Sequence, residues 1–180
     1  MLSRLLPDGW FLTACLVILD PLSGRIEYAL AGHDPPLLVR ARNGAVLSLP
    51  DRGGPPLGPF PDLGYASGEE TIEPGDTLLL YTDGVTETMN PSRAMFGVES
   101  LRAALTGADH LPLAVVKNAL LSRLDAFAAG KARADDATIL MLRRLALAEE
   151  QVGDGDRREY ADGLGGEGAG QRVAGLLDAD

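Results

Sequence analysis

Three aspartates at the ends of two apolar segments could bind a cation together. Asp83 follows the apolar run 78–81, and Asp135 and Asp136 come directly before the apolar run 137–142. If these runs are neighbouring antiparallel strands, the three carboxylates meet at one edge of a sheet. Converging carboxylates repel each other unless a proton or a cation lies between them. Oxygen ligands alone favour a hard cation, so the pattern predicts a Mg²⁺ or Mn²⁺ site of the kind that assists phosphate chemistry.

Each of these residues also has a purely structural interpretation. Asp-Gly, found at residues 83–84, is a common turn pair. Asp135 and Asp136 could be loop residues that pair with nearby basic side chains, which stabilises a surface very little. His33, in the segment 31–36, could serve as a general acid, or its ring could simply hydrogen-bond the backbone between two hairpins.

Composition limits the classes of function. The chain has 180 residues, is 46% hydrophobic and carries a net charge of −10. Nine acidic residues and three arginines lie in 146–180, so residues 1–145 carry only −4. This charge argues against nucleic-acid binding.

The lone Cys15 excludes an internal disulfide and a Cys-based zinc site, and its apolar neighbours predict a core position. The sequence has no apolar run of the ~20 residues that span a bilayer and no recognisable signal peptide, so we expect a cytoplasmic protein.

Periodicity predicts strands first and helices later. The first half alternates apolar segments with Pro- and Gly-rich turns, including an Asn-Gly pair at 43–44 that is typical of a hairpin. The run 11–19 is apolar on both faces, which predicts a strand buried on both sides. Apolar residues then recur at helical spacing, followed by a last strand over 137–145. The expected strands are 11–19, 25–31, 37–40, 45–49, 69–73 and 77–82, and the expected helices lie within 91–130.

With these segments in place, the order of short motifs resembles a known family, the SpoIIE-like branch of the PPM-type metal-dependent protein serine/threonine phosphatases. The resemblance covers about 11–145. It rests on six motifs in the family's order, namely Ala-Gly-His-Asp-Pro-Pro (31–36), Gly-Gly-Pro-Pro-Leu-Gly (53–58), Pro-Gly-Asp (74–76), Leu-Tyr-Thr-Asp-Gly-Val-Thr-Glu (80–87), Phe-Gly-Val-Glu-Ser-Leu (96–101) and Asp-Asp-Ala-Thr (135–138).

The resemblance implies an α+β fold, an α-β-β-α sandwich with two Mg²⁺ or Mn²⁺ ions at one end. It implies that Asp83 and Asp135 are metal ligands and that Asp136 is a weaker candidate. It gives His33 no required role. It also implies hydrolysis of phosphoserine or phosphothreonine on a regulatory partner of the anti-anti-sigma type, in partner-switching control of transcription.

One departure from the family limits this expectation. The family's domain begins with strands that carry further metal-binding aspartates, including a bridging one, and residues 1–10 do not match these motifs. We therefore expect 1–145 to be an N-terminally truncated phosphatase domain, and 146–180 to be an acidic, Gly-rich disordered tail. Two hypotheses remain, a metal-dependent phosphatase and a non-catalytic phosphatase-like remnant or binding module. The nucleotide sequence upstream of the Met1 codon would discriminate between them.

Overall fold

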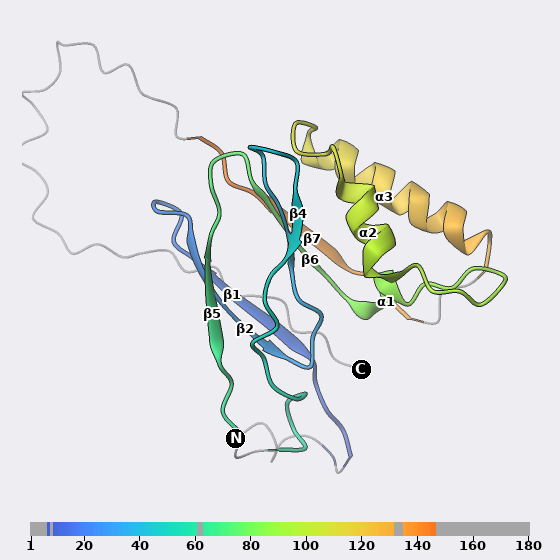
Figure 1. Cartoon of the computed structure of the whole chain (residues 1–180). Helices are drawn as coiled ribbons and strands as arrows, with labels where there is room; N and C mark the ends of the chain where they lie inside the picture. The colour runs from blue at the N-terminus through green and yellow to red at the C-terminus, as the bar shows by residue number, and fades with distance from the viewer. Residues whose placement is uncertain (1–6, 8, 61–62, 132–134, 147–180) are drawn as a thin grey trace, which may run out of the picture.

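The structure, a computed structural model, describes residues 7, 9–60, 63–131 and 135–146. Two antiparallel sheets are stacked, and the longer helices cover one of them (Figure 1). The predicted α+β class is confirmed. The predicted tail lies outside the described residues, apart from residue 146.

The first sheet has three strands in the order β1-β2-β5, formed by Ala14–Leu19, Arg25–Ala31 and Ser67–Thr71. The turn between β1 and β2 contains Asp20, whose carboxylate accepts hydrogen bonds from the Leu22 amide and the Ser23 hydroxyl. These hydrogen bonds, with the Ser23 bond the strongest influence, lower the pKa of Asp20. The predicted edge position of the polar strand near 69–73 is confirmed by β5.

The second sheet has four strands in the order β4-β3-β6-β7. β3 (Leu37–Val39) and β4 (Val46–Ser48) form the predicted hairpin around Asn-Gly. β6 (Thr77–Tyr81) lies between β3 and β7 (Ile139–Arg143), and it pairs with β7 from Thr77↔Arg143 to Tyr81↔Ile139. The antiparallel pairing on which the cation-site prediction depends is therefore present.

Side-chain alternation in the second sheet divides the core into two layers. Leu79 and Tyr81 of β6 face the helices, whereas Leu78 and Leu80 face the first sheet. Every residue of β6 is buried. A strand covered on both faces reads as a continuous apolar run, which is why this segment lacks polar alternation.

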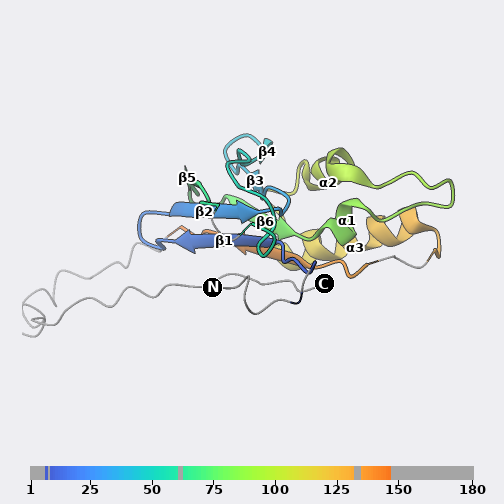
Figure 2. The ribbon, with the colours of Figure 1, turned by 90° about the horizontal axis from the view of Figure 1, so that it is seen from below.

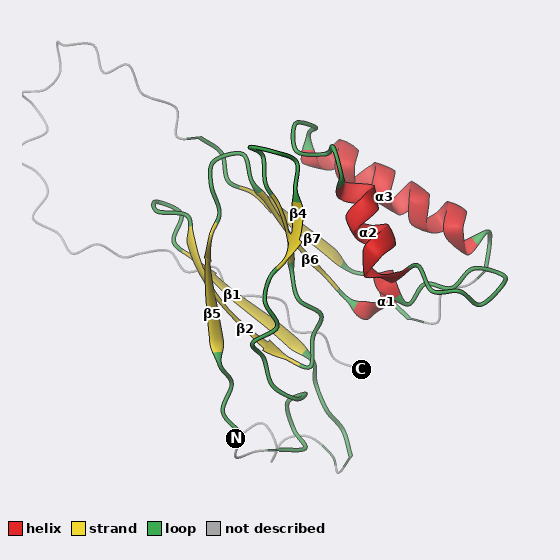
Figure 3. Cartoon of the chain, viewed as in Figure 1, coloured by secondary structure: helices red, strands yellow, loops and turns green. Residues whose placement is uncertain are grey.

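Three helices follow β6 in the sequence: the single-turn α1 (Asp83–Thr86), α2 (Gly97–Leu105) and α3 (Leu113–Ala128). The helical spacing expected within 91–130 is confirmed in α3, which buries Val116, Leu120 and Leu124 on one face. Figures 2 and 3 show α2 and α3 on the side of the second sheet that faces away from the first sheet. α1 was not predicted, because four residues are too few to show helical periodicity.

The prediction that residues 11–19 are buried on both sides is wrong. Cys15 faces the core at 4% exposure, but Leu16 and Ile18 on the opposite face are 46% and 38% exposed. In the described part of the chain no helix covers the outer face of the first sheet. Three of the four layers expected from the resemblance are thus present among the described residues.

Candidate functional site

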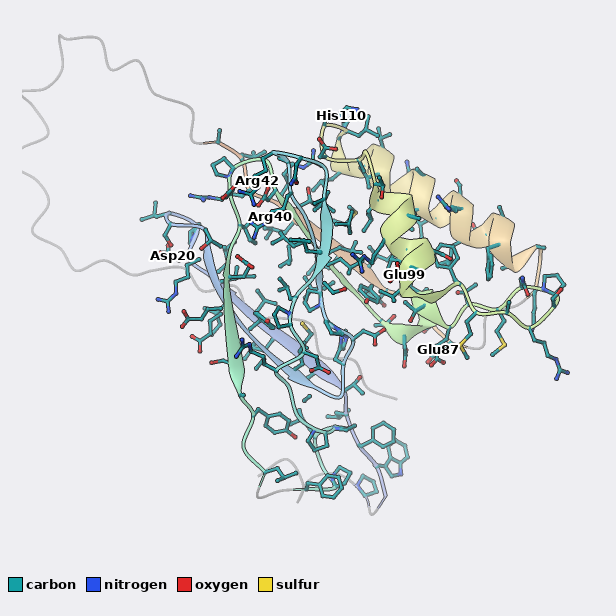
Figure 4. All side chains as sticks on the ribbon, viewed as in Figure 1. Asp20, Arg40, Arg42, Glu87, Glu99 and His110 are labelled. Carbon is teal, nitrogen blue, oxygen red and sulfur yellow. The ribbon has the colours of Figure 1, made fainter. Side chains whose placement is uncertain are left out.

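A polar cleft of about 380 Å³ lies at the end of the sandwich where β2 and β6 end and β7 begins. Five carboxylates and one imidazole line it, those of Asp34, Asp83, Glu87, Asp135, Asp136 and His33. The structure therefore brings all four predicted site residues to one cleft. Figure 4 shows Glu87 beside α1, at the opposite end of the sheets from Arg40.

Asp83 is placed by the end of β6. It follows Thr82, whose extended backbone begins the single turn α1, and Asp83 is the acidic residue of that first turn. The Asp83 carbonyl accepts a 2.7 Å hydrogen bond from the Glu87 amide. Because β6 is buried along its whole length, the sheet fixes the position of the turn that carries Asp83, whose own side chain is exposed.

The turn after β6 is joined to the segment before β7 by Thr82. Its hydroxyl donates to the Asp136 carbonyl at 3.1 Å and accepts from the Thr138 amide at 2.9 Å. The backbone amide of Thr82 also donates to the Thr138 carbonyl at 3.1 Å. A methyl group added at Gly84 would collide with the carbonyl oxygen of Asp136. The Thr-Asp-Gly order therefore has a physical basis, with Thr82 as a link and Gly84 as the point of closest backbone approach.

Asp135 and Asp136 occupy the other wall of the cleft. One carboxylate oxygen of Asp135 accepts the Asp136 amide at 2.7 Å. This local hydrogen bond holds the Asp135 side chain against its own loop through one of its two carboxylate oxygens. Both residues are exposed, so a cation here would keep part of its water shell.

His33 and Asp34 come from the loop after β2. The Nδ1 atom of His33 lies 3.0 Å from the Asp34 carbonyl oxygen, and because a carbonyl can only accept, Nδ1 carries a proton and donates. The Thr86 hydroxyl of α1 donates to the Asp34 carboxylate at 3.3 Å. His33 therefore makes the backbone hydrogen bond that the structural interpretation predicts, and it also lines the cleft.

Sequence reasoning missed Asp34 and Glu87 as residues of the cleft. Both lie inside motifs that carry the resemblance. Neither lies at the end of a strand that the sequence predicts to pair with β6. The available signal was proximity in the sequence, because Asp34 directly follows His33 and Glu87 lies about one helical turn beyond Asp83.

Two groups next to the cleft remain neutral. Burial, with a smaller contribution from the Asp34 carboxylate, raises the pKa of the Tyr81 phenol well above its ordinary value. Burial also raises the pKa of the Cys15 thiol to about 11. A protonated, buried thiol is a poor nucleophile, so the predicted core role of Cys15 is supported.

The donor set suits a hard divalent cation, because the cleft supplies carboxylate oxygens from three separate segments and no thiolate. Within the described ranges, however, no three His, Cys, Asp or Glu side chains form a group that could hold a metal ion. The described residues thus provide carboxylates on facing walls rather than a closed set of ligands. Mg²⁺ commonly binds through one or two carboxylates and several waters, and the cleft fits that mode.

The profile of the Stage II sporulation protein E (SpoIIE) family matches residues 1–145. The chain belongs to the SpoIIE family. Among curated proteins, this SpoIIE-family chain is 31% identical over 134 residues to the phosphoserine phosphatase RsbP of Bacillus subtilis, and 28% identical over 137 residues to protein IcfG of Synechocystis. These matches cover 73% and 74% of this chain but only 30% and 21% of RsbP and IcfG.

Solved structures confirm the family's fold. The crystal structure of the RsbU and RsbW domains of Rv1364c from Mycobacterium tuberculosis matches with a TM-score of 0.67 and 30% identity, over 81% of this chain and 39% of that chain. The SiaA-PP2C domain of Pseudomonas aeruginosa matches with a TM-score of 0.64 and 24% identity, over 73% of this chain and 51% of that one. The SpoIIE-family chain therefore has the PP2C-type phosphatase fold. None of its described helices is long and apolar enough to cross a membrane.

Proposed function

We propose that the cleft is part of the catalytic centre of a metal-dependent phosphatase that hydrolyses phosphoserine or phosphothreonine on a regulatory partner protein. The observation that carries this proposal is the meeting of Asp83 with Asp135 and Asp136 across one cleft, in a chain of the SpoIIE family. RsbP is named a phosphoserine phosphatase, and the chain is 31% identical to it. The partner would be a phosphorylated protein of the anti-anti-sigma type, and the setting would be the cytoplasm.

Asp83 and Asp135 are the proposed ligands of a divalent cation, Mg²⁺ or Mn²⁺, with Asp136 as a weaker candidate. When bound, such a cation lowers the pKa of a water and neutralises phosphoryl oxygens. The cleft's own charge makes that neutralisation necessary. Five carboxylates line the cleft and repel a phosphate dianion at short range, so the carboxylates must be charge-compensated before a phosphoester can enter.

Beyond metal-bound water we assign no catalytic group, and His33 is only a weak candidate, as proton donor to the leaving oxygen of the serine or threonine. It is the only imidazole in the described lining of the cleft, and the Asp34 carbonyl fixes the orientation of its ring. This role requires a ring protonated on both nitrogens.

A second function, a non-catalytic binding module, also has an observation in its favour. The described carboxylates do not form a three-ligand metal group, so a second cation has no evident site among them. We therefore expect the 180-residue chain by itself to turn over substrate slowly or not at all, although it binds one cation.

The experiment is a titration of the 180-residue chain with Mn²⁺, read from the electron paramagnetic resonance signal of the free ion, beside a phosphatase assay on a phosphorylated protein. We expect Asp83→Asn to weaken Mn²⁺ binding at least tenfold, because the amide keeps the side chain's size and removes its charge. Asp51→Asn, at an exposed aspartate outside the cleft, is the matched control and should bind like the parent chain.

The two functions differ in turnover. Metal-dependent turnover that is lost in Asp83→Asn supports the phosphatase, whereas Mn²⁺ binding that depends on Asp83 without any turnover supports the binding module. Turnover without metal, or equal Mn²⁺ affinity in Asp83→Asn and Asp51→Asn, would overturn the proposed cation site.

A further inference from the structure

Thr82 makes contacts that its place in the cleft does not require. Its hydroxyl is both donor and acceptor, and both partners belong to the single segment that carries Asp135 and Asp136. These partners are separated from Thr82 by 54 and 56 residues in the sequence. The two hydrogen bonds therefore join the two walls of the cleft beyond the point where the regular pairing of β6 and β7 ends at Tyr81↔Ile139.

We propose that Thr82 is a positioning residue that sets the separation of the cation-binding carboxylates on the two walls of the cleft. This inference rests on the proposed function, because it assumes that Asp83 and Asp135 bind one cation. Asp83 is the residue after Thr82, and Asp135 is the residue before Asp136, whose carbonyl accepts the Thr82 hydroxyl. A shift of the segment relative to Thr82 moves Asp135 away from Asp83.

The backbone alone does not fix this separation. Past Tyr81, the Thr82 amide makes one ladder hydrogen bond, to the Thr138 carbonyl. Without the Thr82 hydroxyl, the Asp136 carbonyl and the Thr138 amide lose their contact with this wall. Gly84 allows the segment to approach, but a glycine has no side chain that could hold it there. The close approach therefore depends on Thr82 for attraction and on Gly84 for space.

The alternative is that Thr82 contributes only to general stability. The choice of variants separates the two roles. Thr82→Val has nearly the same shape and removes both hydrogen bonds, whereas Thr82→Ser keeps the hydroxyl. Thr71→Val, on the exposed edge strand β5, is the same substitution away from the cleft and is the matched control.

The experiment measures Mn²⁺ affinity, melting temperature and amide hydrogen exchange at Asp136 and Thr138 in the full chain. We expect Thr82→Val to weaken Mn²⁺ binding about tenfold, the usual size of the effect when a residue that orients a metal ligand is removed. Exchange at Thr138 should become faster even without metal, because its acceptor is gone. Thr82→Ser should restore both values.

The outcomes distinguish this inference from the proposed function. If Asp83→Asn weakens Mn²⁺ binding but Thr82→Val does not, the proposed function stands and the positioning role is wrong. If neither variant changes Mn²⁺ affinity, or the parent chain binds no Mn²⁺, the cation site itself is wrong. Equal Mn²⁺ affinities of Thr82→Val and Thr82→Ser would also overturn the positioning role, because the hydroxyl would then make no difference.

Discussion

Single residues at the end of the sheets opposite the cleft show how charge is used for stability. Asp76 is fully buried and accepts hydrogen bonds from the Arg40 guanidinium at 2.8 Å and from the amides of Ala41 and Glu73. Arg40 also donates to the Thr71 carbonyl and pairs with Glu70. Its burial opposes the charge, but the bonds to Asp76 and Glu70 outweigh that effect and raise the pKa of Arg40. The Pro-Gly-Asp motif thus ties the first sheet to the second.

We expect Asp76→Ala to lower the free energy of unfolding by about 3–5 kcal/mol, because it leaves a buried guanidinium with one partner fewer. Glu69→Ala is the control, since it removes an ion pair with Arg25 in which both side chains are about 60% exposed. That control should cost less than about 1 kcal/mol. Denaturant melts of both variants provide the measurement, and equal losses would show that burial does not decide the value of these pairs.

At the scale of elements, the turn from β6 into α1 and the segment before β7 form one unit. The unit depends on a close backbone contact at Gly84, where any side chain would meet the Asp136 carbonyl. α1 is a single turn, too short to be stable as an isolated helix, and the fully buried Val85 anchors it in the core, so it cannot easily move aside.

Gly84→Ala should therefore separate the two segments, lower the free energy of unfolding by about 1–3 kcal/mol and weaken Mn²⁺ binding. Gly64→Ala is the control, because nothing lies within 4 Å of a methyl group added there. Thermal melts and the Mn²⁺ titration test the prediction together. If Gly84→Ala kept the stability and the Mn²⁺ affinity of the parent chain, the Asp136 carbonyl would be able to move aside without loss of free energy.

At the scale of the whole molecule, the apolar surface is distributed unevenly between the two sheets. The second sheet is covered by the first sheet on one face and by α2 and α3 on the other. The outer face of the first sheet exposes Leu16 and Ile18, and β1 lies at the edge of that sheet. An exposed edge strand with an apolar face is prone to pair with other chains.

We expect Leu16→Thr combined with Ile18→Thr to reduce self-association with little loss of stability, because threonine suits an exposed strand. Val17→Thr is the contrasting variant. Val17 packs against the core between the sheets, so the same kind of change should destabilise the chain by about 1–3 kcal/mol. Light scattering against concentration, with melts alongside, measures both effects. Unchanged scattering in the double variant would show that this face does not drive association.

The sequence by itself determined most of the elements and four of the six ionisable residues that line the cleft. Apolar runs bounded by turn residues located β2 and β6, and helical spacing located α3, because these signals depend only on residues that are close in the sequence. The position of Asp83 and Asp135 at facing ends of two apolar strands predicted their meeting, since antiparallel neighbours bring such ends together.

Only the tertiary structure decided the remaining features, and in each case the reason is that the contact is distant in sequence. Asp34 reaches the cleft because the loop after β2 packs beside α1, which no local pattern records. The Thr82 link joins residues more than 50 positions apart. The exposure of Leu16 and Ile18 depends on which layers surround β1, and an apolar strand carries no information about what covers it.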